Sequence, residues 1–109
     1  MHDLYAELMK KDGQNIYTLT RNIPARMRVD DQGLTIHYQS GNKLFIPKQM
    51  AMDALRMLEA KGVLTLEDVH EKITLGNGAR TDRLMAALRE IPGVRYTAIP
   101  RTLSLDKVK

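Results

Sequence analysis

The side chains that most often perform catalysis or hold metal ions are few in this chain and far apart. Cysteine is absent, which excludes disulfides, thiolate nucleophiles and cysteine-based metal sites. The three histidines, His2, His37 and His70, are widely separated in the sequence. His70 shares a predicted helix with Glu67 and Glu71, but one histidine beside carboxylates is more typical of a solvated helix face than of a metal site. These residues predict no metal site and no cofactor.

Nucleophile and acid–base arrangements are equally weak. Ser40 and Ser104 are the only serines, and both lie in or beside predicted strands or turns without a nucleophile motif. The carboxylate pairs Asp30-Asp31 and Glu67-Asp68 are explained by a turn and a helix cap. We therefore expect a noncatalytic binding module rather than an enzyme.

A glycine-rich segment, Gly76-Asn77-Gly78, precedes a predicted helix and resembles a weak anion-binding turn. Thr81 stands where a dinucleotide fingerprint has its third glycine, and the Gly-Lys-Ser/Thr ending of a P-loop is absent. The segment also follows a helix rather than a strand. A plain turn is the favoured interpretation.

Positive charge is concentrated near the end of the chain. The formal net charge is +4 and the pI is about 9.5. Residues 1–75 have ten basic and ten acidic side chains, whereas residues 76–109 have seven basic and three acidic ones. This asymmetry favours attraction to a phosphate backbone, although a short basic tail also improves solubility.

In the first half, the spacing of Leu4, Tyr5 and Leu8 predicts a short amphipathic helix that docks on the domain or on a second copy. From Ile16 to Ile46 the hydrophobic period becomes two, which predicts an antiparallel meander of three or four strands with one buried face. Lys43 to Ile46 is its last strand. The polar face of the meander is expected to have the following residues: Arg26, Arg28, Thr35, His37 and Gln39.

This meander provides two alternative surfaces. An edge strand is able to recruit a partner chain. Single-stranded nucleic acid is a weaker alternative, because such binders usually stack bases on exposed aromatic rings and the four tyrosines here are scattered.

Three helices and a hairpin are predicted in the second half. The first helix begins at Pro47 and ends before Gly62. The second begins at Thr65, whose side chain accepts from the N–H of Asp68, and runs to about Ile73. The third covers about Ala79 to Glu90. A hairpin follows around Pro100-Arg101, and we expect its loop to exceed two residues because proline cannot take the positive φ of a I′ or II′ turn.

This order of elements resembles that of the winged helix-turn-helix superfamily. The resemblance rests on element order, lengths and charge, and the matching stretches are Pro47–Ala60, Thr65–Ile73, Ala79–Glu90 and Val94–Asp106. It implies that the third helix enters the major groove of DNA while the hairpin lies along a phosphate backbone or the minor groove. The helix face opposite Leu84 and Leu88 is then the reading face, with these residues: Ala79, Asp82, Arg83, Ala86, Arg89 and Glu90.

The expected protein is thus a single α+β domain over residues 1–109, with a helix and meander in 1–46, a winged-helix-like unit in 47–106 and a tail in 107–109. The expected function is binding of double-stranded DNA as a small cytoplasmic regulator or specificity component. The DNA-binding residues are expected to be Arg80, Arg83, Arg89, Arg95, Arg101 and Lys107. The alternative is a protein-interaction or inhibitor module, or a homodimer, acting through the meander or the N-terminal helix. A membrane partner is not expected, because no apolar run approaches the roughly 20 residues of a membrane span.

Overall fold

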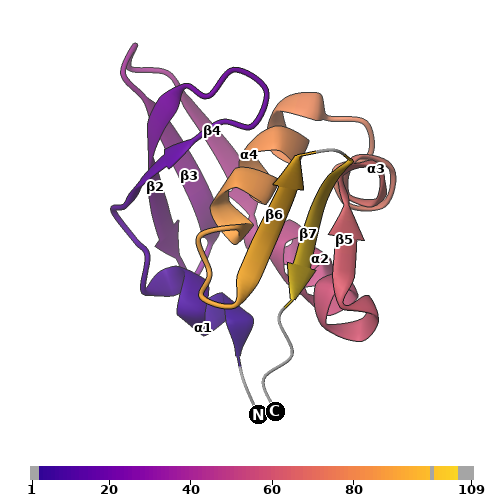
Figure 1. Ribbon diagram of the computed structural model, residues 1–109. Helices are drawn as coiled ribbons and strands as arrows, with labels where there is room; N and C mark the ends of the chain where they lie inside the picture. The colour runs from indigo at the N-terminus through magenta and orange to yellow at the C-terminus, as the bar shows by residue number, and fades with distance from the viewer. Residues whose placement is uncertain (1–2, 99, 106–109) are drawn as a thin grey trace.

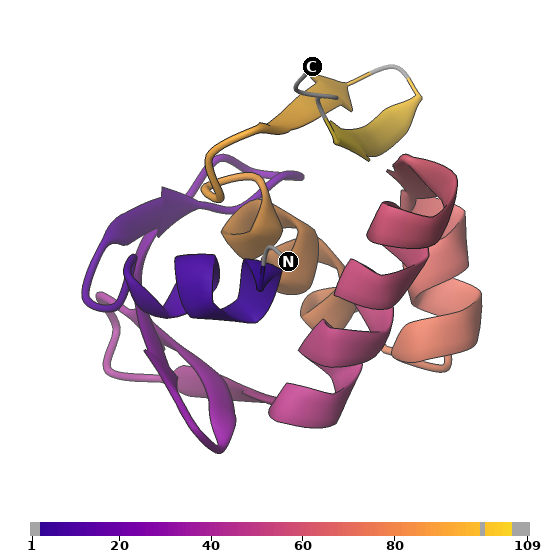
Figure 2. The same cartoon turned by 90° about the horizontal axis from the view of Figure 1, so that it is seen from below.

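Two antiparallel sheets enclose a central helix in this protein (Figure 1). The computed structural model describes residues 3–98 and 100–105. A four-stranded sheet has the order β1-β2-β3-β4, and a three-stranded sheet has the order β5-β7-β6. Helix α4 lies between the two sheets, as the views in Figures 1 and 2 both show. The predicted α+β class is confirmed.

The four-stranded sheet is the predicted meander. Its strands are β1 (Asn15–Tyr17), β2 (Pro24–Asp30), β3 (Gly33–Tyr38) and β4 (Lys43–Pro47). Along β2, buried Ala25, Met27 and Val29 alternate with exposed Arg26 and Arg28. This alternation gives the sheet one face in the core and one in solvent.

Helices α1 (Leu4–Met9) and α2 (Lys48–Lys61) flank the inner side of this sheet. Asp3 caps α1 by accepting from Tyr5 N at 3.0 Å. The buried side chains of α1 are Leu4, Tyr5 and Leu8, so this helix docks on its own domain. Gly62, with a φ of +76°, ends α2 as predicted.

A short strand that the sequence did not predict follows α2. It is β5 (Val63–Thr65), and it precedes α3 (Leu66–Asp68), which continues as a π-helical turn, η1 (Val69–Ile73). Thr65 Oγ1 accepts from Asp68 N at 3.1 Å, as expected of the cap. Three residues between two capping signals are too few to show an alternating pattern.

The chain ends in α4 (Gly78–Leu88) and the hairpin of β6 (Val94–Ala98) and β7 (Arg101–Leu105). The register pairs Ala98 with Arg101, so only two residues separate the strands and the expectation of a longer loop is wrong. A proline in the loop excludes particular turn types, but it does not fix the length of the loop. β7 also pairs with β5, which joins the hairpin to the start of α3.

One core unites both halves of the chain. Its cluster of buried apolar side chains extends from Leu4 to Leu103 and includes residues of both sheets and of α1, α2 and α4. Within residues 3–98 and 100–105, no helix is both long and apolar enough to cross a bilayer.

Candidate functional site

The predicted reading helix, α4, is largely buried. Its seven buried residues are Thr81, Asp82, Leu84, Met85, Ala86, Ala87 and Leu88. Ala86 is 0% exposed and Asp82 only 5%, so placing these two residues on an exposed reading face is wrong. The physical reason is that α4 has protein on more than one side: β1 and β4 of the meander pack against one, and α3 with η1 packs against another.

Asp82 has a structural role at this buried position. Its carboxylate accepts from Leu19 N at 2.9 Å, from Thr20 N at 2.9 Å and from Thr20 Oγ1 at 2.6 Å. These bonds fasten the β1–β2 connection to α4. The carboxylate is fully used within the protein, so it is not a candidate acid or base.

The three arginines of the α4 region that were predicted to bind DNA reach toward the meander instead. Arg80 Nε donates to Phe45 O at 3.0 Å, Arg83 Nε to Tyr38 Oη at 2.7 Å, and Arg89 Nη2 to Tyr17 O at 2.9 Å. The guanidinium groups of Arg83 and Arg89 also lie over aromatic rings. Their contact with DNA stays a prediction, but these donors already serve the fold.

The remaining predicted DNA-binding residues belong to the hairpin and to the residues after it in the sequence. Arg101 Nη1 donates to Thr20 Oγ1 at 3.2 Å, and Arg95 is an exposed residue of β6. Lys107 lies outside the described residues. The predicted phosphate contacts of this part of the chain stay predictions.

A second basic surface is built by the meander. The strand register places Asn15 opposite Arg26, Arg26 opposite His37, and His37 opposite Lys43. Directly paired residues share one face of an antiparallel sheet, so these four side chains form a line across all four strands. All four are exposed. We call this line the cross-strand row, and the solvent-facing side of the sheet the outer face.

The cations of the cross-strand row have no carboxylate partner in the part of the chain that the structure describes. Among residues 3–98 and 100–105, neither Arg26 nor Lys43 takes part in an ion pair. Arg28, on the same face, is paired with Asp12 at 2.9 Å. The N–H of Val29 and then the Arg28 guanidinium hold the pKa of the Asp12 carboxyl below its usual value. The outer face therefore has a net positive charge.

Exposed aromatic rings flank the same surface. Tyr17 on β1 is 47% exposed and Phe45 on β4 is 43% exposed. The register places Tyr17 opposite Pro24 and Phe45 opposite Thr35. The alternation in the sequence placed Arg26, Arg28 and His37 on this polar face correctly. It missed that Asn15 and Lys43 extend them into one row, because strand register and the number of strands are set by turns rather than by periodicity.

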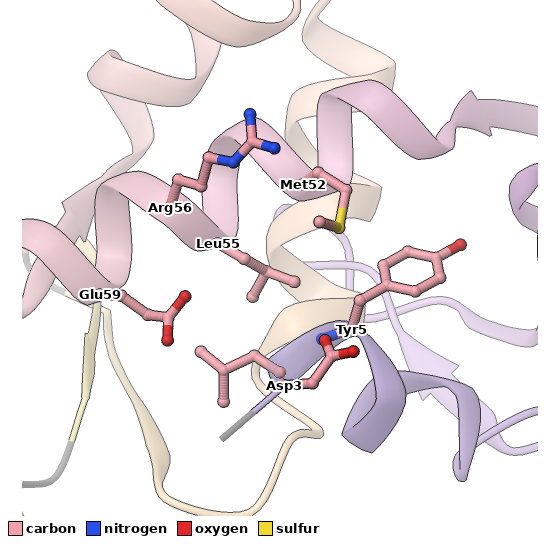
Figure 3. A pocket seen from close by; sticks show the side chains of 7 residues that line it. Asp3, Tyr5, Met52, Leu55, Arg56 and Glu59 are labelled. Carbon is pink, nitrogen blue, oxygen red and sulfur yellow. The ribbon is translucent and has the colours of Figure 1, made fainter. Parts of the chain in front are cut away.

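A groove lies between α1 and α2 (Figure 3). Leu4, Tyr5, Met52 and Leu55 contribute apolar lining, and Asp3, Arg56 and Glu59 are its charged members. Two carboxylates against one guanidinium do not favour an anionic ligand. A protein contact near the N-terminal helix stays a prediction, and this mixed apolar and charged lining is a surface on which to test it.

The glycine-rich turn before α4 forms an ordinary helix start. The Asn77 side chain accepts from Arg80 N at 3.0 Å, which satisfies one of the N–H groups that an anion would need. His70 Nδ1 lies 3.3 Å from Thr81 Oγ1. In the described part of the chain, no group of three or more His, Asp or Glu side chains is arranged to hold a metal ion.

Comparisons of this chain with protein-family models, with curated proteins and with solved structures found no match.

Proposed function

We propose that the protein is a noncatalytic nucleic-acid-binding module that contacts phosphates with the outer face of its four-stranded sheet. The observation that carries the proposal is the cross-strand row, in which exposed cations lie in a line and have no carboxylate partner among the described residues. Phosphate contacts by Lys and Arg supply most of the affinity in sequence-independent nucleic-acid binding.

Two carboxylates that border this face, Asp12 and Asp30, already accept hydrogen bonds, which supports the proposal. Asp12 is held by Arg28 and by Val29 N. Asp30 Oδ1 accepts from Gln32 N at 2.8 Å and from Gly33 N at 3.2 Å. An approaching phosphate therefore meets the cations of the cross-strand row, while the charge of Asp12 at the margin is offset by its ion pair with Arg28.

The winged-helix assignment of residues 47–106 remains a separate proposal. Residues 48–105 contain three helical segments and a hairpin in the order on which the resemblance rests. The burial of α4 means that its central turns do not offer a free face to a major groove. For this reason we assign the phosphate contacts to the meander rather than to the third helix.

The edges of the sheet favour nucleic acid over a partner strand. In an antiparallel pair of strands, hydrogen-bonded residue pairs alternate with pairs that are not hydrogen-bonded. Tyr38 N donates to Asn42 O, and Lys48 N donates to Gln32 O, which shows which pairs of β3 and β4 are hydrogen-bonded. The pair of Thr35 and Phe45 is not one of them, so the carbonyl of Phe45 points to the free edge of β4. Arg80 donates a hydrogen bond to that carbonyl, and Arg89 donates one to the carbonyl of Tyr17 on β1. An added strand would have to displace these arginines.

Titration of the protein into fluorescently labelled DNA at low salt tests the proposal by fluorescence anisotropy. We expect Arg26→Gln and Lys43→Gln each to weaken binding about fivefold, because each removes one charge-assisted phosphate contact. Arg56→Gln is the matched control, since it removes the same charge from α2, where the side chain is 67% exposed. Loss of affinity equal to the control, or no binding at all, would refute the proposal and leave a protein partner as the better hypothesis.

A further inference from the structure

A depression on the outer face lies beside the cross-strand row. It has a volume of about 380 Å³ and includes Asn15, Pro24, Arg26, His37 and Gln39 among its lining residues. This size is near the lower end of the roughly 300–1,000 Å³ that small-molecule sites occupy. Three of its lining residues, Asn15, Arg26 and His37, also belong to the cross-strand row, so the depression and the phosphate-binding cations adjoin.

The polar side chains of the depression have unused hydrogen-bonding capacity. Within the described ranges 3–98 and 100–105, the side chains of Asn15, His37 and Gln39 have no hydrogen bond to another protein group. Each side-chain amide has both a donor and an acceptor. Such amides match the hydrogen-bonding edges of nucleobases, as their bidentate contacts with adenine illustrate.

A stacking surface stands at the rim. Tyr17 is directly opposite the lining residue Pro24 and two residues from Asn15 on the same face of β1. The residue is 47% exposed. Unstacked bases of single strands commonly stack on exposed aromatic rings while their polar edges are hydrogen-bonded.

The width of the sheet determines which form of nucleic acid reaches the depression. Neighbouring strands lie about 4.7–4.9 Å apart, so β1 and β4 are separated by about 14 Å before side chains are added. The major groove of B-DNA is about 12 Å wide and admits a helix or a two-stranded ribbon. A duplex therefore keeps its base edges out of reach, whereas a single strand is free to turn one base toward the sheet.

We infer that this depression is a binding site for one unpaired nucleobase, which makes single-stranded nucleic acid the ligand of the outer face. The inference rests on the proposed function, because the cations of the cross-strand row, Arg26 at the depression and Lys43 beyond His37, hold the backbone beside that base. Tyr17 stacks on the base, and the amides of Asn15 and Gln39 bind its polar edge.

The experiment compares three DNA probes of equal length: a single strand, the same backbone made of abasic nucleotides, and a duplex. We expect the wild-type protein to bind the single strand about tenfold more tightly than either other probe. Tyr17→Ala, and separately the pair Asn15→Ala with Gln39→Ala, should remove this preference and leave abasic binding unchanged. Lys43→Gln should weaken all three probes alike, and circular dichroism confirms that each variant is folded.

The outcomes separate the two proposals. If the wild-type protein binds abasic or duplex DNA as tightly as the single strand, the base site is wrong although phosphate binding by the outer face stands. If Tyr17→Ala and the amide pair leave the preference intact, the base lies elsewhere and the inference is overturned. Failure of every probe to bind refutes both the base site and the proposed function.

Discussion

Asp82 is a buried charged residue whose hydrogen bonds hold the β1–β2 connection against α4. Its carboxylate accepts two backbone N–H groups and one hydroxyl from the β1–β2 connection. Removal of a buried acceptor leaves its donors unsatisfied, and each such loss costs about 1–3 kcal/mol. The residue was predicted to face solvent, because a charge opposite an apolar stripe normally does so.

We therefore expect Asp82→Ala to lower the free energy of unfolding by about 3 kcal/mol, as measured by urea denaturation. Asp53→Ala is the control: Asp53 makes only exposed contacts with Gln49 and Arg56 on α2, and we expect a loss below about 1 kcal/mol. Similar midpoints for the two variants would show that the Asp82 bonds do not stabilise the fold.

Tyr5 provides a prediction for alkaline pH. Its hydroxyl donates to Asp30 O at 2.7 Å. Burial, followed by the negative charges of Asp30 and Asp31, raises the pKa of Tyr5 from 10.0 to about 12. The folded protein thus retains this proton at pH values where the unfolded chain has lost it, so the contribution to stability is complete below pH 10 and is lost as the pH rises through about 12.

Tyr5→Phe should remove most of that alkaline decline in unfolding free energy, which urea denaturation at a series of pH values will show. At neutral pH the same variant should be about 1 kcal/mol less stable, because the hydrogen bond to Asp30 is lost. Parallel pH profiles for the wild type and the variant would contradict the assigned pKa.

At the scale of elements, α4 shows where prediction from the sequence ends. Its start and length were nearly correct, and Leu84 and Leu88 are buried as predicted. Ala86 and Ala87 gave no warning of a second covered face, because alanine is equally compatible with solvent and with close packing. Periodicity identifies the more hydrophobic side of a helix but does not count the elements that pack around it.

Ala79 and Ala86 make this difference measurable. Both were predicted on one exposed face, but Ala79 is exposed and Ala86 is buried. Ala86→Leu should overpack the space around α4 and cost about 1–3 kcal/mol in thermal or urea denaturation. Ala79→Leu, the matched change on the same helix, should alter stability by less than about 0.5 kcal/mol. Equal tolerance of both substitutions would restore the exposed face that the sequence suggested.

In the sheets, alternation in the sequence predicts which side chains are buried, but it does not predict how the strands align. Alternation in Pro24–Asp30 predicted which side chains face solvent, and the burial pattern confirms it. The cross-strand row depends on how four strands align, and β5 depends on pairing with β7, about 40 residues later in the chain. Such pairings are long-range contacts, so local sequence patterns carry little information about them.

For the whole molecule, charge along the chain and charge on the surface are different quantities. The excess of basic residues lies after residue 75, but Arg80, Arg83 and Arg89 donate to groups of the meander. Meanwhile the outer face lies within residues 1–75, whose ten basic and ten acidic residues balance. A segment with no net charge thus presents a positive row of side chains, because its acidic residues lie outside the cross-strand row and Asp12 is paired with Arg28.

The salt dependence of DNA binding distinguishes these two locations of charge. Each phosphate contacted contributes a slope of about −0.7 for a single strand or −0.9 for a duplex to the plot of log affinity against log salt. With Arg26 and Lys43, the cations of the cross-strand row, as the contacting groups, we expect a total slope of about −1.4 to −1.8. Arg26→Gln should reduce its magnitude by about 0.7–0.9, whereas Arg101→Gln, which removes the same charge from β7, should leave the slope unchanged. If Arg101→Gln flattens the plot as much as Arg26→Gln does, the phosphate contacts extend to the hairpin, and the charge asymmetry of the sequence was the better guide to the binding surface.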